Sequence, residues 1–184
     1  MLAKKMECNF LDADNFHPQA NIEKMSKGIP LTEEDRIPWL ETLRDTLRNK
    51  MNLIKSMSSN IDTGNDKKKP EVILCCSALQ KSYREILRTA DPNYKPGSYI
   101  AGRVRFVCLE APMEVIESRV KRRGEEGNHF MPASLLQSQF DLLQIDPAEK
   151  DITVVDATHS PQVIVNNIQA SVFGSLNFIS SLEN

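Results

Sequence analysis

Residues Phe10-Leu11-Asp12-Ala13-Asp14-Asn15-Phe16-His17-Pro18 run from an apolar, strand-like segment directly into two aspartates. In open α/β sheets, ligands bind beyond the carboxyl ends of the strands. Two carboxylates at such a point can hold Mg²⁺ through water and accept a proton from a substrate hydroxyl. The alternative is that Asp12 and Asp14 only form Asx turns that close the strand. On spacing alone, this structural explanation is somewhat the more common of the two.

Four short apolar runs have the character of buried parallel strands, and each is followed by polar or small residues and then by a helical pattern. This alternation predicts an α/β fold with a parallel sheet. The four runs are Cys8–Leu11, Val72–Cys76, Val104–Leu109 and Ile152–Val155.

The spacing of apolar residues predicts the helices. The clearest stripe, with spacings of 3, 4, 4 and 3, follows the acidic residues Glu33-Glu34-Asp35 and consists of Leu40, Leu43, Leu47, Met51 and Ile54. The first residues, Leu2-Ala3-Lys4-Lys5-Met6, resemble the end of a helix. Further helices are expected over Gln80–Thr89 and from Pro112, Pro132 and about Pro161, with loops over Ser56–Pro70 and Asp91–Gly102.

The composition excludes several classes of protein. The 184 residues suit one domain, and 23 Lys and Arg against 25 Asp and Glu give a net charge of −2. This balance gives no electrostatic case for binding nucleic acid or an anionic membrane, and no apolar run approaches the ~18 residues of a membrane-spanning helix. Cysteines occur only inside apolar runs, at Cys8, Cys75, Cys76 and Cys108, without a Cys-x-x-Cys pair. We therefore expect buried free thiols in a reducing, cytoplasmic compartment.

Several cationic side chains are placed where they could bind an anion, and each also has an ordinary structural explanation. Arg36 could bind a carboxylate or phosphate bidentately, or could form a surface pair with Asp35 or Glu33. Lys81 and Arg84 lie one helical turn apart, which suits anion binding and equally a solvated helix face.

Another group of arginines ends the helix that follows the third predicted strand. Arg119, Arg122 and Arg123 lead into a short glycine-bearing segment that contains His129. Positive charge at a helix C-terminus is favourable by itself, by about 0.3–1 kcal/mol per residue. The functional alternative is a lid that brings the arginines onto a transferring phosphoryl group. On the next predicted helix, Gln139 could reach a polyol hydroxyl.

Taken together, these segments resemble the gluconokinase family, which phosphorylates D-gluconate at O6 with ATP and Mg²⁺. The resemblance implies a three-layer, P-loop kinase-like α/β fold. It implies a single domain over residues 1–184, with a polar insert at 56–70 and a lid at about 122–132. It also implies a cytoplasmic enzyme, in a family that often forms homodimers. It rests on Leu11-Asp12-Ala13-Asp14-Asn15-Phe16-His17-Pro18, Asn21–Met25, Gly28-Ile29-Pro30-Leu31, Asp35–Leu40, Cys76–Arg84, His129-Phe130-Met131 and Gln137-Ser138-Gln139-Phe140.

The resemblance also implies a role for each candidate residue. Asp14 resembles the carboxylate that orients or deprotonates the 6-hydroxyl, and Asp12 resembles the carboxylate that meets Mg²⁺ through water. The gluconate carboxylate and hydroxyls would be held by Arg36 and Arg84, in a pocket lined by His17, His129 and Gln139. The lid cations for the ATP phosphates would be Arg119 and Arg123.

One departure from the family pattern is serious. A P-loop kinase needs Gly-x-x-x-x-Gly-Lys-Ser/Thr after its first strand, and none of the 7 glycines is followed by Lys-Ser or Lys-Thr. We therefore expect an N-terminally truncated chain without the central strand that would lie between Val72–Cys76 and Val104–Leu109, and with little or no kinase activity. The alternatives are a non-catalytic relative that binds a sugar acid or a protein, and a kinase for another polyol acid. His17-Pro18 and Gln137–Phe140 count against the second of these.

Overall fold

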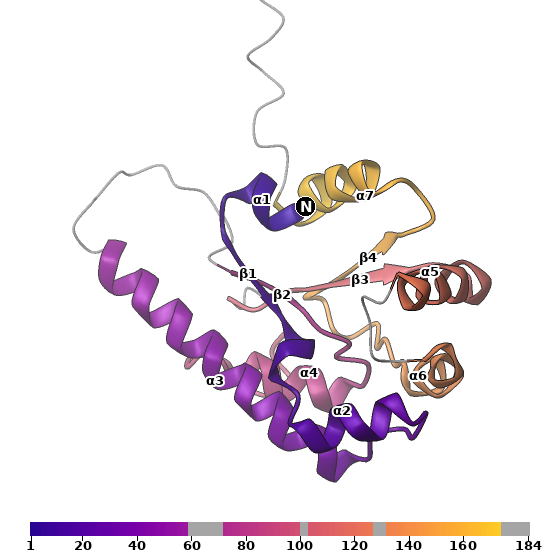
Figure 1. Ribbon diagram of the computed structural model, residues 1–184. Helices are drawn as coiled ribbons and strands as arrows, with labels where there is room; N and C mark the ends of the chain where they lie inside the picture. The colour runs from indigo at the N-terminus through magenta and orange to yellow at the C-terminus, as the bar shows by residue number, and fades with distance from the viewer. Residues whose placement is uncertain (59–71, 100–102, 127–131, 174–184) are drawn as a thin grey trace, which may run out of the picture.

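The computed structural model describes residues 1–58, 72–99, 103–126 and 132–173 (Figure 1). The strands are β1 (Asn9–Asp12), β2 (Val72–Cys75), β3 (Phe106–Glu110) and β4 (Ile152–Asp156). The helices are α1 (Leu2–Met6), α2 (Gln19–Ser26), α3 (Glu33–Ser58), α4 (Lys81–Arg88), α5 (Met113–Glu125), α6 (Leu136–Leu142) and α7 (Pro161–Ile168). Single turns of 3₁₀ or π geometry occupy Ala13–Phe16, Ala133–Leu135 and Gln169–Phe173.

The strands form two parallel pairs. In one pair β1 lies beside β2, with Asp12 opposite Cys75, and in the other β3 lies beside β4, with Glu110 opposite Asp156. All four predicted strands are confirmed to within one or two residues at their ends. Among the described residues, β2 and β3 do not pair with each other. This is the position at which the sequence predicts that a shared neighbour is missing.

Helices lie on both sides of the strands (Figure 1), so the chain has the layered α/β architecture that the sequence predicts. Helices α1 and α7 lie on one side, where Lys5 Nζ donates to Asn166 Oδ1 at 2.6 Å. Helices α3 and α4 lie on the other side, where Leu40, Leu43, Leu47 and Met51 of the predicted stripe are buried in a core with Tyr83 and Leu87 of α4. The centre of this core is Leu40 and Leu43, whose exposed fractions are 0%.

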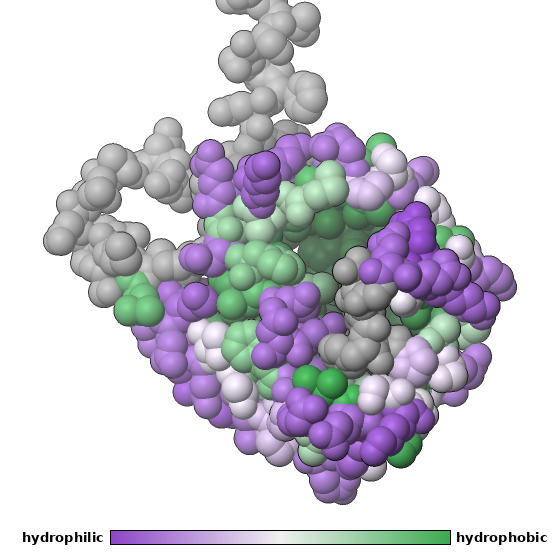
Figure 2. All heavy atoms as spheres, viewed as in Figure 1, coloured by the Kyte–Doolittle hydropathy of each residue, from purple (hydrophilic) through white to green (hydrophobic). Residues whose placement is uncertain are grey.

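A groove with a volume of about 510 Å³ separates β2 from β3. It is lined by residues of both strands and by helices of both layers, including Leu2 of α1 and Leu47 and Met51 of α3. The face of the molecule in Figure 2 is hollowed near its middle, and the surface inside the hollow is hydrophobic. The unpaired strands therefore leave apolar surface accessible, as the sequence predicts.

A buried cluster of charged side chains joins α4 to the segment that leads into β4. Glu149 accepts hydrogen bonds from Arg84 at 2.7 and 2.9 Å and from Arg88 at 2.6 Å, and Arg88 also pairs with Asp151 at 2.7 Å. The exposed fraction of Glu149 is 3%. Burial raises the pKa of Glu149, but the hydrogen bonds from the two arginines outweigh it and hold the pKa below its usual value.

The structure corrects some sequence-based expectations. The first residues of the expected loop over Ser56–Pro70 are helical instead, because α3 extends through Ser58, and the rest of that insert lies outside the described residues. The four cysteines are free thiols as expected, but Cys75 is exposed and the other three are only half-buried. Cys76 and Cys108 line the groove, and Cys75 and Cys76 line a second pocket at the carboxyl ends of β1 and β2, so these strands are covered incompletely. Helix α2 was not predicted, because its short polar segment has no apolar stripe.

Candidate functional site

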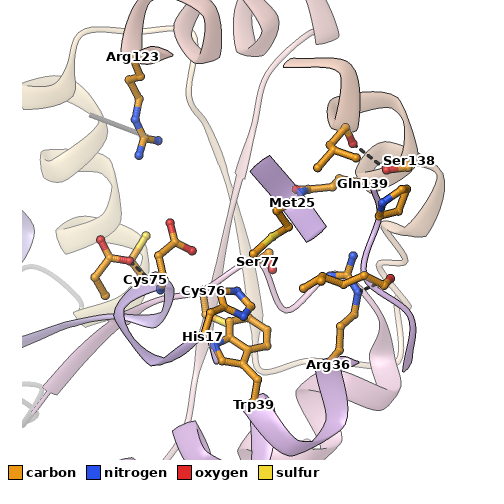
Figure 3. Close-up of a pocket in the computed structure, with 15 residues that line it drawn as sticks. His17, Met25, Arg36, Trp39, Cys75, Cys76, Ser77, Arg123, Ser138 and Gln139 are labelled. Carbon is orange, nitrogen blue, oxygen red and sulfur yellow. Dashed lines mark hydrogen bonds between the residues drawn. The ribbon is translucent and has the colours of Figure 1, made fainter. Parts of the chain in front are cut away.

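A pocket of about 270 Å³ lies at the carboxyl ends of β1 and β2. It is the place where a parallel α/β sheet holds its ligands. Figure 3 shows side chains converging on it from several elements, with Arg123 pointing in from α5 and Gln139 from α6. Six of the residues predicted from the sequence line this pocket: Asp12, Asp14, His17, Arg36, Arg123 and Gln139.

The two aspartates have different local roles. Asp12 caps the 3₁₀ turn that follows β1, because its Oδ1 accepts a hydrogen bond from the backbone N–H of Asp14 at 3.2 Å. The Asx turn that the sequence offered as the alternative is thus present, and the same carboxylate also faces the pocket. Among the described residues no group of three or more His, Cys, Asp or Glu is placed to hold a metal ion. Mg²⁺ nevertheless fits, because it keeps several waters and needs only one or two carboxylates.

Arg36 is a buried cation at the pocket wall. Its exposed fraction is 6%, its Nε donates to the carbonyl of Leu31 at 3.2 Å, and its guanidinium lies 6.0 Å from the ring centre of Tyr83. No described residue accepts a hydrogen bond from its two terminal nitrogens, and the side chain lines the pocket (Figure 3). Because the terminal nitrogens are directed to the pocket and not to an internal acceptor, they can donate two hydrogen bonds to an anionic ligand there.

The surface pair that the sequence offered as the alternative for Arg36 does not form. Asp35 instead pairs with Lys24 of α2 at 2.6 Å and accepts from the backbone N–H of Thr32 at 3.0 Å. These bonds lower the pKa of Asp35, with the Lys24 hydrogen bond as the largest cause. Asn21 donates to the Asp35 carbonyl at 3.1 Å. Helix α2 therefore fixes the first turn of α3, from which Arg36 enters the pocket.

His17 and Trp39 form one wall of the pocket. Trp39 is a core residue with an exposed fraction of 3%, and its Nε1 donates to the carbonyl of Ala13 at 2.9 Å. Its ring also stacks on His17 (Figure 3), a role that sequence reasoning missed. Burial lowers the pKa of His17, and the charge of Arg36 adds to this against the opposing charge of Asp14. The imidazole is therefore neutral at pH 7.

The opposite wall is largely apolar and comes from α2, from the segment before α3 and from the 3₁₀ turn before α6. Met25, Leu31 and Leu135 form a small buried cluster beside Gln139. Cys75 also lines the pocket. Although the residue as a whole is exposed, partial desolvation of the thiol at the pocket wall raises its pKa, and the nearby carboxylates of Asp12 and Asp14 add to this, so that the thiol is protonated and a poor nucleophile. The chemistry of the pocket therefore rests on the carboxylates and the cations.

The structure does not bring the other predicted residues into this pocket. Arg84 is buried, and all five of its N–H groups are used, by Glu149 and by the carbonyls of Ala78, Leu79 and Gln144. It therefore has no donor left for a substrate, which overturns the expectation that it holds gluconate. Its neighbour Lys81 is likewise paired, with Asp146 at 2.6 Å.

The predicted lid is described only in part. Its first residues belong to the last turn of α5, and His129 lies outside the described residues. Arg119 sits one turn before Arg123 on the same helix and donates from Nη1 to the carbonyl of Ala157 at 2.7 Å. Of the two predicted lid cations, only Arg123 lines the pocket.

Parallel strands flanked by helices, with carboxylates and cations at the strand ends, define this chain as an α/β protein of the P-loop kinase type. No described helix is both long and apolar enough to cross a membrane. No protein-family model matches the chain. Individual proteins do match it, and the chain belongs to the gluconokinase family.

The family assignment rests on curated relatives and a solved structure. The chain is 49% identical over 177 residues to a gluconokinase of Arabidopsis thaliana, a match that covers 96% of this chain and 85% of the relative. It is 38% identical over 159 residues to the thermosensitive gluconokinase of Escherichia coli, which covers 86% of this chain and 70% of the relative. The crystal structure of a gluconokinase from Sinorhizobium meliloti matches with a TM-score of 0.65 at 32% identity, covering 92% of this chain and 79% of that one.

Proposed function

We propose that this chain binds D-gluconate in the pocket at the ends of β1 and β2, for transfer of the γ-phosphate of ATP to the 6-hydroxyl. The product would be 6-phosphogluconate. The observation that supports this most is Arg36, a buried guanidinium whose terminal nitrogens have no described acceptor, in the same pocket as Asp12 and Asp14. A sugar acid needs a cation for its carboxylate and polar groups for its hydroxyls, and the pocket offers both.

The residues in the pocket divide the work of binding and proton transfer. Arg36 would bind the gluconate carboxylate bidentately. Asp14 would accept a hydrogen bond from the 6-hydroxyl and then its proton, as that oxygen attacks phosphorus. Neutral His17 and Gln139 would bind hydroxyls along the chain of the sugar acid. Such kinases gain most of their rate from positioning and charge neutralisation.

The phosphate end of the site would lie at Asp12 and Arg123. Asp12 has the hard oxygen ligands that Mg²⁺ prefers and would hold the ion through water. Mg²⁺, when bound, neutralises charge on the transferring phosphate. Arg123 would add a positive charge from α5, and Arg119 would support it from the preceding turn. We also propose that His129, which lies outside the described residues, binds the substrate in this pocket.

A second candidate function is binding of the sugar acid without catalysis. The observation that favours it is the absence of a Gly-x-x-x-x-Gly-Lys string from the 184 residues, since this loop supplies the backbone N–H groups and the lysine that cradle phosphates. We therefore propose that the chain as written transfers phosphate slowly.

Two measurements on the purified 184-residue chain separate these candidates. The single tryptophan lies in the pocket, so its fluorescence should change as gluconate binds, whereas the uncharged sugar alcohol sorbitol should change it much less. Gluconate-dependent ADP release should stay close to background. Rapid ADP release would refute the proposal of slow transfer, and equal responses to gluconate and sorbitol would refute the proposed substrate.

The remaining features are proposals of the same kind. We propose a single domain over residues 1–184 and a cytoplasmic location. A homodimer is a further proposal, which analytical ultracentrifugation would test by the concentration dependence of the sedimentation coefficient.

A further inference from the structure

Arg84 does not line the gluconate pocket, yet it is bonded to the backbone of two segments that border it. The side chain is buried. Its Nη1 donates to the carbonyls of Ala78 and Leu79, both at 2.9 Å, and its Nη2 donates to the carbonyl of Gln144. A guanidinium presents its N–H groups in a rigid, planar fork, so these three carbonyls are held at fixed positions relative to one another.

The first of these carbonyls belongs to a turn with an unfavourable backbone conformation. Ala78 has a φ of 32°, in the left-handed region that costs free energy for a residue with a side chain. Such a conformation persists only where the surrounding structure restrains it. The bond from Arg84 to the Ala78 carbonyl is one such restraint, and the bond from the Gln144 N–H to the Leu79 carbonyl, at 2.9 Å, is another. Arg84 therefore stabilises a turn that alanine alone disfavours.

The turn at Ala78 places a polar side chain in the pocket. Ser77 lies on the segment between β2 and α4 and lines the pocket (Figure 3). Its hydroxyl makes no hydrogen bond to another residue in the described part of the chain. A hydroxyl can both donate to and accept from a hydroxyl of a sugar acid. Because a change of φ at Ala78 redirects the backbone beside it, the position of the Ser77 hydroxyl depends on this turn.

The contact with Gln144 reaches a second wall of the pocket. Gln144 follows α6, from which Gln139 points into the pocket (Figure 3). Because Arg84 is bonded to both segments, it sets the spacing between the backbone near Ser77 and the backbone near Gln139. The buried carboxylate of Glu149 accepts from Nε and Nη2 of Arg84 and fixes the orientation of the guanidinium.

We propose that Arg84 is a positioning residue for gluconate: without touching the substrate, it sets the spacing of Ser77 and Gln139, which bind hydroxyls of the sugar acid. Glu149 acts through Arg84. The proposal rests on the proposed function, because it takes gluconate as the ligand of the pocket. It assigns Arg84 no contact with gluconate, since every N–H group of the guanidinium has an acceptor within the protein.

The test compares two matched variants of the 184-residue chain, Arg84→Lys and Arg88→Lys. Each replaces a buried guanidinium that is bonded to Glu149, but the described side-chain acceptors of Arg88 are carboxylates only, those of Glu149, Asp151 and Glu85. Both variants should lower the urea midpoint. Only Arg84→Lys should also raise the Kd for gluconate, by about tenfold, because an ammonium cannot hold three carbonyls and a carboxylate at once.

A second substitution distinguishes positioning from a general loss of structure. Glycine adopts a positive φ readily, so Ala78→Gly should favour the turn even where the restraint from Arg84 is lost. Added to Arg84→Lys, it should bring the Kd for gluconate back toward the parent's value by about threefold or more. Added to Arg88→Lys, it should leave the Kd unchanged. A general loss of structure would not be repaired by a more flexible residue.

NMR relaxation measures the restraint on the turn without a ligand. The backbone order parameters of Ser77 and Ala78 should fall from about 0.85 to below about 0.6 in Arg84→Lys and should stay high in Arg88→Lys. Ser77→Ala tests the same proposal with the charged cluster intact, even if Arg84→Lys does not fold. Because Ser77 is exposed, this variant should keep the parent's urea midpoint and raise the Kd for gluconate about threefold.

The outcomes separate this proposal from the proposed function. Equal Kd values in Arg84→Lys and Arg88→Lys, with gluconate bound by the parent, would overturn the positioning role alone. An unchanged Kd in Ser77→Ala would overturn it as well, and so would order parameters that stay high in Arg84→Lys. A parent chain that did not bind gluconate would overturn the proposed function and this proposal together.

Discussion

The imidazole ring of His17 lies 4.2 Å from the indole ring of Trp39, centre to centre, with only 12° between the two planes. The same indole donates its N–H to the carbonyl of Ala13. Trp39 therefore holds both ends of the turn that follows β1, and that turn carries Asp14. The orientation of His17 and of Asp14 depends on one aromatic side chain from α3.

Replacing Trp39 should change the titration of His17 as well as stability. Trp39→Phe keeps a ring for stacking but leaves the Ala13 carbonyl without its donor, so it should lower the free energy of unfolding by about 1–3 kcal/mol. Trp39→Leu also removes the ring from the pocket wall and should lower the free energy of unfolding by about 3–5 kcal/mol. Because burial lowers the pKa of His17 from 6.5, only Trp39→Leu should return it toward that value. NMR titration of the imidazole and urea unfolding measure the two effects, and an unchanged His17 pKa in Trp39→Leu would contradict this account.

Arg36→Lys should weaken gluconate binding by about ten- to a hundredfold although it conserves the charge, since an ammonium cannot reproduce a bidentate contact. Calorimetric titration with gluconate is the measurement. The matched control is Arg44→Lys on the same helix, where the side chain pairs with Asp45 away from the pocket. If both variants bound gluconate as the parent does, Arg36 would not be the carboxylate site.

Asp12→Asn separates capping from metal binding. Asparagine caps a helical turn as well as aspartate does, so urea unfolding should give nearly the parent's free energy. The variant loses the negative charge, so Mg²⁺ should no longer strengthen the binding of ATP. Asp12→Ala should in addition lose about 1 kcal/mol of stability. Titrations of ATP with and without Mg²⁺ supply the comparison, and a Mg²⁺ effect that persists in Asp12→Asn would place the ion elsewhere.

The buried Glu149 should make the fold sensitive to acid. Its pKa is held below 4.5 in the folded state, so its contribution is fully present above the unfolded value and is lost as the pH falls through the folded one. Glu149→Gln should therefore lower the free energy of unfolding by about 3–5 kcal/mol at pH 7, because two arginines lose their partner. The difference from the parent should shrink below about pH 4.5, as the parent's own carboxyl protonates. The exposed Glu23→Gln on α2 serves as the control and should change little at any pH.

Sequence patterns predicted the strands because each is a short apolar run that ends in polar residues, and the fold places those ends together. Asp12 and Asp14 could be predicted for that reason, whereas Arg36, in the first turn of α3, was predicted from the resemblance to the family. The error at Arg84 has a physical cause: its acceptors, Glu149 and the carbonyl of Gln144, lie about 60 residues further along the chain. Helical spacing reports that a cation faces one side of a helix, but not which distant group meets it there.

The pocket walls were harder to predict for a similar reason. Met25 and Leu135 meet only in the folded chain, and neither belongs to a polar motif. Trp39 is a core residue, yet its ring also lines the pocket. A sequence pattern predicts one environment for each residue, whereas Trp39 both packs in the core and lines the pocket.

The charged cluster around Glu149 has a consequence for how the molecule unfolds. In the described chain, no backbone ladder joins β2 to β3. Arg84 and Arg88, which follow β2, are bonded to Glu149 and Asp151, which precede β4. The two halves of the sheet are thus joined by these ion pairs, by the hydrogen bond from the Gln144 N–H to the Leu79 carbonyl and by packing of Phe106 on the core, rather than by strand pairing. Acid, which protonates Glu149, should therefore weaken the contact between the two halves before it disturbs the pairing within each of them.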